Sequence, residues 1–333
     1  MLSLKVTRNI YYIIAMPVIL VFFAGLFIMN PVLKMPAKIR ENIKASRENL
    51  YSTVEYLVSA EPPRNFRNTD SLDSTAAYIA GKFREYGYMP ETQEFSAGKH
   101  GTYRNILCSM GPRGGERVIL GAHYDVCGDQ PGADDNASAV AGLLEVARLM
   151  KPFEGRLRYR LDFAAYTLEE PPYFKTCLMG SYIHAKSLHD MGVKVRAMVC
   201  LEMIGYFSDE PGSQTYPNRL LGLFYPDTGD FIGVVGRTWQ RKLVRDVKKY
   251  MIQGSGIKVK SINAPKFIPG IEFSDHLNYW KFGYPAVMIT DTAFYRNYNY
   301  HSAEDTIEKL DFAGMEEVVK GVFHAVRSLA AGE

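Results

Sequence analysis

The sequence predicts an α/β fold in which helices cover both faces of a central, mostly parallel sheet. Stretches rich in apolar residues alternate with helical stretches through most of the 333 residues, and this alternation is typical of parallel sheets. Residues 118–122 (VILGA) carry no polar side chain, as expected for a central strand that is buried on both faces. Hydrophobic residues make up 47% of the chain, which is enough to build a large core.

The elements follow from local patterns. Residues 37–60 carry apolar residues at near-helical spacing until Pro62 and Pro63 stop the pattern. Residues 70–86 form a second helix that Asp70 or Ser71 caps and Gly87 ends. Strands are predicted at 102–110, 117–124, 159–167, 194–203 and 286–289, and helices at 138–150, 182–191, 240–251, 275–282 and 312–330. The expected architecture is a three-layer sandwich around a mostly parallel, mixed sheet.

The stretch 207–229 interrupts this alternation with several glycines and prolines. It is either a surface excursion or one wall of a substrate cleft, since such loops often carry binding residues. The sequence does not separate the two interpretations.

The N-terminal segment is predicted to be a single transmembrane helix that anchors the chain in a membrane. Residues 10–29 contain no charged residue, and a helix of twenty residues spans roughly 30 Å, the thickness of a bilayer core. A cleavable signal peptide is the main alternative, but the residues that follow lack a small-x-small cleavage site. Residues 1–9 are expected in the cytoplasm, residues 30–44 as a linker, and residues 45–333 as one domain outside the cytoplasm.

The net charge argues against a nucleic-acid-binding protein, and the cysteine content argues against a disulfide-rich protein. The formal net charge is +3 and much of the excess lies near the start of the chain, so no nucleic-acid partner is expected. The four cysteines lack CxxC spacing and indicate neither a disulfide framework nor a metal site. Cys108 and Cys200 lie in apolar runs, as core residues do. Cys127 and Cys177 lie in loops that carry site residues, and the sequence leaves open whether they are bridged.

Side chains that can bind metal follow the predicted strands at their carboxyl ends. In chain order they are His123, Asp135, Glu169, Glu170, Glu202 and His301. The carboxyl ends of parallel strands share one edge of the sheet, where ligands bind. We therefore expect these side chains to converge, and such a concentration of negative charge needs a cation.

Imidazole and carboxylate ligands suit zinc or a similar divalent ion. His123 and Glu202 would hold one ion. Glu170 and His301 would hold the other, and Asp135 would bridge the two. Two ions about 3.5–4 Å apart bind a water molecule between them and lower its pKa toward neutrality.

Two neighbours of these ligands have other expected roles. Glu169 lies beside a ligand but is free itself, so it would take the proton of that water and pass it to a leaving amine. Asp125 lies two residues after His123 and would fix the tautomer of the imidazole.

Each of these residues also has a plainer interpretation when it is taken alone. A histidine at a strand end is usually structural or solvated, and Asp134-Asp135-Asn136 suits a helix N-cap. Glu202 is harder to explain in this way, because it interrupts an apolar run where an unpaired carboxylate costs several kcal/mol.

The ordered motifs resemble the M28 family of co-catalytic zinc peptidases, from about residue 51 to the C-terminus. The resemblance rests on His123-Tyr124-Asp125, Pro131-Gly132-Ala133-Asp134-Asp135-Asn136-Ala137-Ser138, Glu169-Glu170 with Gly180-Ser181, Leu201-Glu202-Met203-Ile204-Gly205-Tyr206, Ser274-Asp275-His276 and Tyr300-His301-Ser302-Ala303-Glu304-Asp305-Thr306. It implies the zinc-dependent exopeptidase fold, two zinc ions per chain and a peptide substrate. In that family the residue matching Asp135 bridges the metals, the one matching Glu169 is the general base, and the one matching Asp125 lies behind the ligands.

The chain departs from this family at two places. Ala139 stands where the family usually has glycine, and Pro171-Pro172 stands where many members carry a short glycine-containing turn. The change to Pro171-Pro172 is expected to alter the wall of the site near the general base, Glu169. His276 is interpreted as structural rather than as a ligand. Candidates for stabilising the oxyanion are Tyr295, Tyr298 and Tyr300.

The predicted reaction is hydrolysis of an N-terminal peptide bond, with a zinc-bridging hydroxide as nucleophile and Glu169 as general base. Three alternatives are a glutaminyl cyclase with a single zinc ion, a carboxypeptidase on the same frame, and an anchored ectodomain that kept the fold only for binding. The complete set of ligands argues against the cyclase and the ectodomain. The HExxH, GxSxG and P-loop motifs are absent from the sequence, and the preferred N-terminal residue and the oligomeric state do not follow from it.

Overall fold

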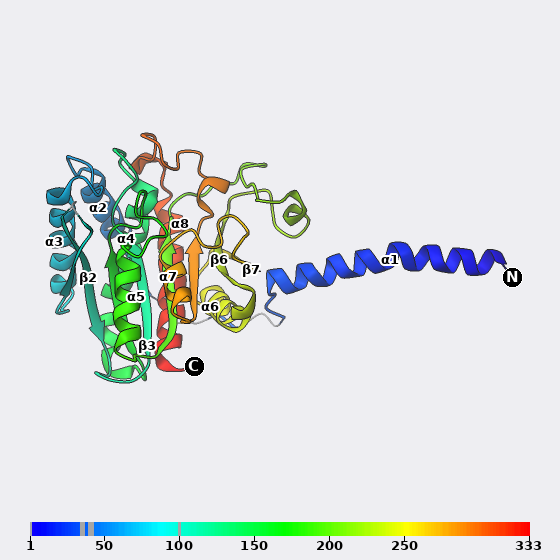
Figure 1. The fold of residues 1–333 in the computed structure, drawn as a ribbon, viewed down its shortest axis with the longest axis horizontal. Helices are drawn as coiled ribbons and strands as arrows, with labels where there is room; N and C mark the ends of the chain where they lie inside the picture. Colours follow the sequence, from blue (N-terminus) through cyan, green and yellow to red (C-terminus); the bar gives the residue numbers. More distant parts are fainter. Residues whose placement is uncertain (1, 34–36, 39–42, 99–100) are drawn as a thin grey trace.

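Figure 1 shows the protein as a computed structural model, which describes residues 2–33, 37–38, 43–98 and 101–333 and, from residue 15 onward, their side chains. The strands are β1 (Glu91–Ser96), β2 (Thr102–Met110), β3 (Arg117–His123), β4 (Arg160–Tyr166), β5 (Val195–Glu202), β6 (Phe231–Arg237), β7 (Lys258–Ala264) and β8 (Ala286–Thr290). The helices are α1 (Leu2–Met29), α2 (Arg47–Val58), α3 (Thr69–Glu85), α4 (Ala139–Met150), α5 (Gly180–Asp190), α6 (Arg241–Gly254), α7 (His276–Lys281) and α8 (Phe312–Ala331). A π-helical turn, Ala133–Ser138, precedes α4, and a 3₁₀ turn, Arg219–Leu223, lies in the loop after β5.

Within the described residues, eight strands form one mixed sheet in the order β1-β2-β4-β3-β5-β8-β6-β7. Strand β3 pairs in parallel with β4 and β5, and β5 pairs in parallel with β8. Strand β2 runs antiparallel to β4, and β6 runs antiparallel to β8. The carboxyl ends of β4, β3, β5 and β8 therefore lie next to one another at one edge of the sheet.

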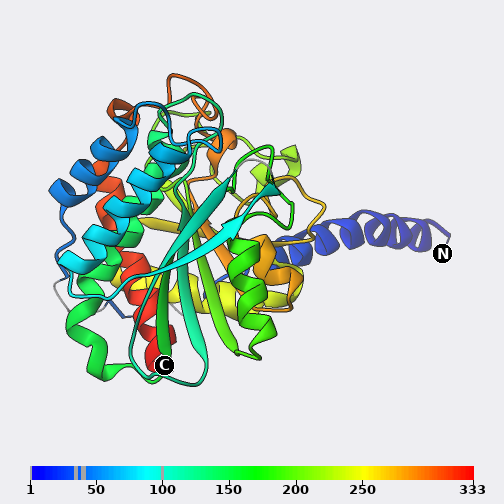
Figure 2. The ribbon, with the colours of Figure 1, turned by 60° about the vertical axis from the view of Figure 1, so that its left-hand side comes forward.

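Helices cover both faces of this sheet (Figure 2). Val118 and Leu120 of β3 pack in a core with α2, α3, α4 and α8, whereas Ile119 between them packs in a second core with α5 and α7. Strand β5 alternates in the same way, with Val199 in the first core and Cys200 in the second. Successive side chains of a strand point to opposite faces, so a strand that is apolar throughout is buried on both sides. The predicted α/β sandwich of three layers is confirmed.

The predicted elements agree closely with the observed ones. All five predicted strands are present with bounds within one residue, and the six predicted helices from residue 70 onward are present with bounds within three residues. The first predicted helix, over 37–60, is observed only as α2, and its residues 39–42 lie outside the described residues. Strands β1, β6 and β7 were not predicted. β1 is a polar edge strand, β6 contains two glycines, and β7 is a short edge strand with alternating polarity, so none of them gives a strong apolar run.

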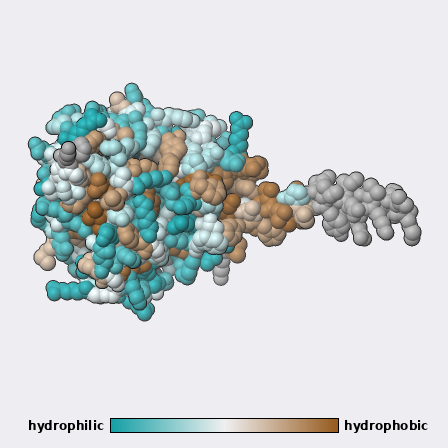
Figure 3. Space-filling view, in the orientation of Figure 1, coloured by the Kyte–Doolittle hydropathy of each residue, from teal (hydrophilic) through white to brown (hydrophobic). Residues whose placement is uncertain are grey.

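Helix α1 leaves the body of the protein next to β7 (Figure 1). Several large apolar side chains on its described part are exposed, among them Ile19 and Phe23, and they form a brown surface in Figure 3. Among the residues that the structure describes, no helix is both long enough and apolar enough to cross a membrane. Residues 10–14 of the predicted span lie outside the residues whose side chains the structure describes. The predicted transmembrane span over residues 10–29 is therefore not supported.

Candidate metal centre

The five predicted metal ligands meet at the carboxyl edge of the central strands. His123 is the last residue of β3, and Glu202 is the last residue of β5. Glu170 follows β4, and His301 lies in the long loop after β8. Asp135 lies in the turn Ala133–Ser138 that leads into α4. The topology of the sheet thus brings together residues that are up to 178 positions apart in the sequence.

Asp135 lies between two imidazoles. Its Oδ1 atom is 3.4 Å from Nε2 of His123, and its Oδ2 atom is 3.1 Å from Nε2 of His301. Glu202 Oε2 lies 3.3 Å from Nε2 of His123, and Glu170 Oε2 lies 3.3 Å from Nε2 of His301. The five side chains therefore form two groups that share Asp135, in the pairing expected from the sequence.

Several atoms of this cluster that could bind a metal have no hydrogen-bond partner among the described residues. They are the buried atoms Nε2 of His123, Oδ1 of Asp135, Oε1 of Glu170 and Nε2 of His301. Buried polar atoms are otherwise almost always paired, and an unpaired buried charge is costly. Mixed imidazole and carboxylate donors are those that zinc prefers. The residues present therefore fit a pair of zinc ions.

The surplus of carboxylates shifts the pKa values of the cluster. Burial and the charge of Asp135 raise the pKa of Glu170 to about 8. Burial also raises the pKa of Glu169 well above its ordinary value, and the charges of Glu170 and Glu202 act in the same direction. Burial opposes protonation of His301, but Asp135 and Glu170 outweigh it and raise its pKa to about 12. Without metal, the carboxylates and imidazoles of the cluster therefore bind protons. A divalent cation would displace these protons when it binds.

Asp125 holds the turn that carries the expected general base. Its Oδ1 and Oδ2 atoms accept hydrogen bonds from the backbone N–H groups of Glu169 and Glu170, both at 3.1 Å. Its Oδ1 atom also lies 3.5 Å from Nδ1 of His123. Asp125 therefore lies behind the imidazole, as predicted, and in addition fixes the Glu169-Glu170 turn. Glu169 itself is buried, and its Oε2 atom lies 3.9 Å from Nε2 of His123.

Asp305 orients the loop of the shared aspartate. Its two carboxylate oxygens accept the backbone N–H groups of Asp134 and Asp135, each at 3.0 Å. Asp134 in turn accepts hydrogen bonds from the backbone of Gly205 at 2.9 Å and from the side chain of Asn297 at 2.8 Å. These bonds tie the Asp135 loop to the end of β5 and to the loop after β8. Asp305 lies in a motif found in the sequence, but this role was not predicted.

Arg64 is a buried residue whose role was not predicted from the sequence. Its guanidinium donates to the carbonyl oxygens of Leu57 at 2.8 Å, Tyr124 at 2.9 Å, Pro131 at 2.6 Å and Gly132 at 2.6 Å. Burial lowers the pKa of Arg64 to about 10. The side chain thereby joins the end of α2 to both ends of the loop between β3 and Asp135. No periodic pattern surrounds Arg64, which follows two prolines in a mostly polar stretch, so no sequence signal indicates its role.

The Ser274-Asp275-His276 motif contacts the cluster through the side chain of Ser274. Ser274 Oγ donates a hydrogen bond of 2.6 Å to Oε2 of Glu202. Nε2 of His276 lies 2.8 Å from the carbonyl oxygen of Ile271, and its ring packs edge-on against Trp280 at 4.5 Å. His276 is therefore structural, as predicted.

Backbone strain is concentrated around the cluster. Leu168, Met203 and His301 have φ angles of 59°, 44° and 55°, in the left-handed region that residues with a side chain rarely occupy. Leu168 precedes Glu169, Met203 follows Glu202, and His301 belongs to the cluster itself. Such conformations persist where the surrounding structure imposes them, often at functional sites.

The three tyrosines that were candidates for oxyanion stabilisation differ in position. The ring of Tyr300 stacks on His301 with a centroid distance of 3.7 Å. Burial and the carboxylates of the cluster raise the pKa of Tyr300, which keeps its hydroxyl protonated. Tyr298 is 74% exposed, and Tyr295 donates its hydroxyl to the carbonyl oxygen of Pro269. Of these three, Tyr300 lies closest to the cluster.

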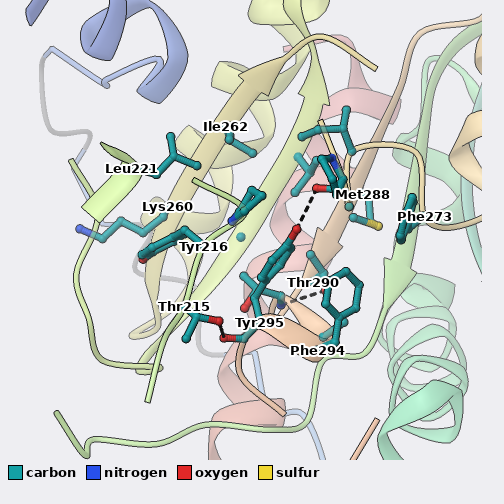
Figure 4. Close-up of a pocket in the computed structure, with 18 of the residues that line it drawn as sticks. Thr215, Tyr216, Leu221, Lys260, Ile262, Phe273, Met288, Thr290, Phe294 and Tyr295 are labelled. Carbon is teal, nitrogen blue, oxygen red and sulfur yellow. Dashed lines mark hydrogen bonds between the residues drawn. The ribbon is translucent and has the colours of Figure 1, made fainter. Parts of the chain in front are cut away.

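A cavity of about 110 Å³ adjoins the cluster, because Glu202 and Tyr300 form part of its lining. Figure 4 shows other residues of that lining. Tyr216 and Leu221, both from the stretch 207–229, form one side of it. That stretch is therefore a wall of the cavity, which agrees with one of its two interpretations. Most of the remaining lining is apolar, including Ile262, Phe273, Met288 and Phe294.

All four cysteines are free. The bridge between Cys127 and Cys177 that the sequence left open is therefore not formed. Cys108 and Cys200 are buried, as expected of core residues, whereas Cys177 is exposed.

Comparison with known sequences identifies the relatives of the chain. The family model described as peptidase family M28 matches residues 105–326. Protein YfbL of Escherichia coli (strain K12) is 47% identical over 286 residues, which are 84% of this chain and 87% of that protein. Leucine aminopeptidase 1 of Colletotrichum graminicola is 27% identical over 228 residues, which are 65% of this chain and 51% of that protein. The chain thus spans about half the length of this fungal relative.

Solved structures share the fold. The Legionella pneumophila LapA aminopeptidase matches with a TM-score of 0.66 and 20% identity, over 89% of this chain and 76% of that chain. A Bacteroides thetaiotaomicron glutaminyl cyclase, bound to N-acetylhistamine, matches with a TM-score of 0.64 and 19% identity, over 86% of this chain and 99% of that chain. The fold is therefore common to aminopeptidases and glutaminyl cyclases. Since the family model covers most of the chain, the protein is a hydrolase that belongs to peptidase family M28.

Proposed function

We propose that the chain is a two-zinc aminopeptidase that removes apolar residues from the N-terminus of peptides. The observation that carries this proposal is the position of Asp135, which directs one carboxylate oxygen toward each of two imidazoles whose Nε2 atoms have no hydrogen-bond partner. His123 and Glu202 would hold one ion, and Glu170 and His301 would hold the other, with Asp135 shared. Two bound zinc ions would polarise the scissile carbonyl and acidify a water molecule.

Glu169 is the proposed general base. It is buried next to the ligands, and Asp125 fixes its backbone at 3.1 Å. Its carboxylate would accept a proton from the attacking water and deliver it to the nitrogen of the leaving amine. Tyr300, whose hydroxyl stays protonated, is the proposed hydrogen-bond donor to the oxygen of the reacting carbonyl.

The cavity beside Glu202 is proposed to receive the side chain of the N-terminal residue. Its apolar lining favours side chains such as leucine or phenylalanine, because burying apolar surface contributes about 25 cal/mol per Å². A charged side chain would lose much of its hydration among these apolar groups, although Lys260 also belongs to the lining. The proposed preference for apolar N-terminal residues therefore rests on the cavity and did not follow from the sequence alone.

The relatives favour an aminopeptidase over a carboxypeptidase, because leucine aminopeptidase 1 of Colletotrichum graminicola matches 65% of this chain. Glutaminyl cyclase activity is the second candidate, because a glutaminyl cyclase shares the fold. The donors for a second metal, Glu170 and His301 with Asp135, favour the peptidase.

Metal analysis and a substrate panel test the proposal together. Two zinc ions per chain are expected, and a chelator should abolish release of aminomethylcoumarin from leucyl and phenylalanyl substrates. Glu169→Gln should lower kcat by about 10²–10⁴-fold while both metals stay bound. Asp135→Ala should lose metal as well as activity. Cyclisation of N-terminal glutamine without peptide hydrolysis would favour the cyclase, and a chain that binds no zinc would favour a non-catalytic binding role.

The location of the domain outside the cytoplasm stays a prediction from the sequence. A reporter enzyme fused after Glu333 tests it. A reporter that is active only in the cytoplasm would reverse the predicted orientation.

A further inference from the structure

A cysteine lies within ligand distance of the second proposed metal position. The Sγ atom of Cys127, a carboxylate oxygen of Glu170 and a ring nitrogen of His301 all lie within 4.8 Å of one another. Glu170 is buried, whereas Cys127 and His301 are partly buried. This contact was not expected from the sequence, because Cys127 is not part of a CxxC pair.

The spacing of these three atoms suits one metal ion. Zinc binds sulfur at about 2.3 Å and nitrogen or oxygen at about 2.0–2.2 Å, so its tetrahedral ligands lie about 3.3–3.6 Å apart. Three donors within 4.8 Å of one another reach this spacing by small side-chain rotations. Cys127 is in a loop and partly exposed, so its side chain has room to rotate.

A second observation is an unpaired carboxylate oxygen at this position. Glu170 is 4% exposed, and within the described part of the chain its Oε1 atom has no hydrogen-bond partner, although its Oε2 atom lies 3.3 Å from His301. Nε2 of His301 likewise has no hydrogen-bond partner. A buried carboxylate oxygen without a partner, next to a thiol and an imidazole, indicates a position for a cation.

We propose that the thiolate of Cys127 is a ligand of the second metal ion, together with Glu170, His301 and the shared Asp135. The proposal rests on the proposed two-metal function. On binding, the thiol releases its proton to solvent and the sulfur forms a bond to the metal. Sulfur at this position selects thiophilic ions such as zinc, cobalt and cadmium over magnesium and manganese. The two metal positions would then differ in kind, one with nitrogen and oxygen donors and the other with a sulfur donor in addition.

Cobalt substitution of the full chain tests this proposal by a readout other than activity. A sulfur ligand of Co²⁺ gives an intense charge-transfer absorption in the near ultraviolet, which nitrogen and oxygen ligands do not give. The band is expected to grow with the one equivalent of Co²⁺ that occupies the position beside Cys127. Cys127→Ser should lack the band and should bind the second ion at least about tenfold more weakly. Cys177→Ser is the matched control, since Cys177 is an exposed cysteine outside the cluster, and it should keep the band.

A second measurement uses the unaltered chain. In chelator, Cys127 and Cys177 should both react with a thiol reagent, and zinc should protect only Cys127. Two bound cobalt ions with peptide hydrolysis but no sulfur band, or a band that survives in Cys127→Ser, would overturn the role of Cys127 and leave the proposed function intact. A sulfur band without hydrolysis of any peptide would support Cys127 as a ligand and count against the proposed function. A chain that binds no cobalt would refute both.

Discussion

The Oδ1 atom of Asp125 accepts a hydrogen bond from the backbone N–H of Glu169 at a distance of 3.1 Å. The two residues are 44 positions apart and follow neighbouring parallel strands, β3 and β4. The same carboxylate also holds the backbone of Glu170 and faces His123. One side chain thus fixes the base, one proposed ligand of each ion and the turn between them.

Asp125→Asn should therefore weaken catalysis without unfolding the protein. The amide replaces one acceptor oxygen by an NH₂ group, so only one of the two backbone hydrogen bonds can be kept. We expect kcat/KM for a leucyl substrate to fall about 10–100-fold, as for other residues that orient metal ligands. Thermal unfolding and steady-state kinetics measure the two effects. Asp190→Asn changes an exposed aspartate on α5 and should leave kcat/KM unaltered; an equal loss in both variants would contradict the role of Asp125.

Arg64→Met should destabilise the protein. It removes four charge-assisted hydrogen bonds and leaves the carbonyl oxygens of Leu57, Tyr124, Pro131 and Gly132 without that donor. The loss should exceed about 3 kcal/mol, because buried acceptors lose their partners. Measured in chelator, so that metal binding does not contribute, the unfolding midpoint should fall by at least about 6 °C. Arg67→Met is the control, since Arg67 is exposed three positions further on, and equal midpoints for the two variants would refute the role of Arg64.

The difference between Arg64 and the predicted ligands shows what the sequence can predict. His123 and Glu202 terminate apolar strands, and the rule that parallel strands end at one edge is enough to bring them together. Arg64 and Asp305 act through backbone groups of other loops, and no periodic pattern indicates which loops will be neighbours. The sequence therefore predicted the proposed ligands but not the contacts that hold them.

The same reasoning explains the elements that were missed. Strands β3 and β5 are buried on both faces and are apolar throughout, so they are evident from the sequence. Strand β6 contains Gly233 and Gly236, and β1 exposes most of its residues at the edge of the sheet. These strands depend on pairing with neighbours rather than on their own side chains. The number of strands in the sheet therefore could not be predicted from the sequence. The cavity next to β6 and β7 could not be predicted for the same reason.

Stability should fall in acid because of His184. This side chain is buried on α5, where Tyr279 lies 2.8 Å and Tyr166 3.3 Å from its Nδ1 atom. Burial lowers its pKa to about 4, although the charge of Asp162 raises it and that of Arg117 lowers it further. The folded state thus prefers neutral His184, whereas the unfolded chain binds a proton near pH 6.5. The stabilisation is complete above pH 6.5 and is lost as the pH falls toward 4, up to about 3 kcal/mol.

Urea unfolding of His184→Gln at pH 7 and pH 4 measures this effect. The variant should lose about 3 kcal/mol less between these two values than the unaltered chain, when both are measured in chelator. His189→Gln is the control on the same helix, because His189 is exposed. If His184→Gln and the unaltered chain lost equal stability in acid, His184 would not be the group that titrates.

Leu221→Trp should narrow the proposed pocket for the N-terminal side chain. Leu221 lies in the short turn Arg219–Leu223 and contributes to the lining of the cavity, so a larger side chain occupies space that a substrate needs (Figure 4). The kcat/KM value for a phenylalanyl substrate should fall at least about tenfold, whereas that for an alanyl substrate should change little, because losing room for one or two methylene groups costs this much in an apolar pocket. Leu223→Trp is the control, since Leu223 lies in the same turn but is 69% exposed and outside the lining. Equal losses for both substrates in Leu221→Trp would mean that the variant disturbs the catalytic cluster itself, and an unchanged preference would place the N-terminal side chain elsewhere.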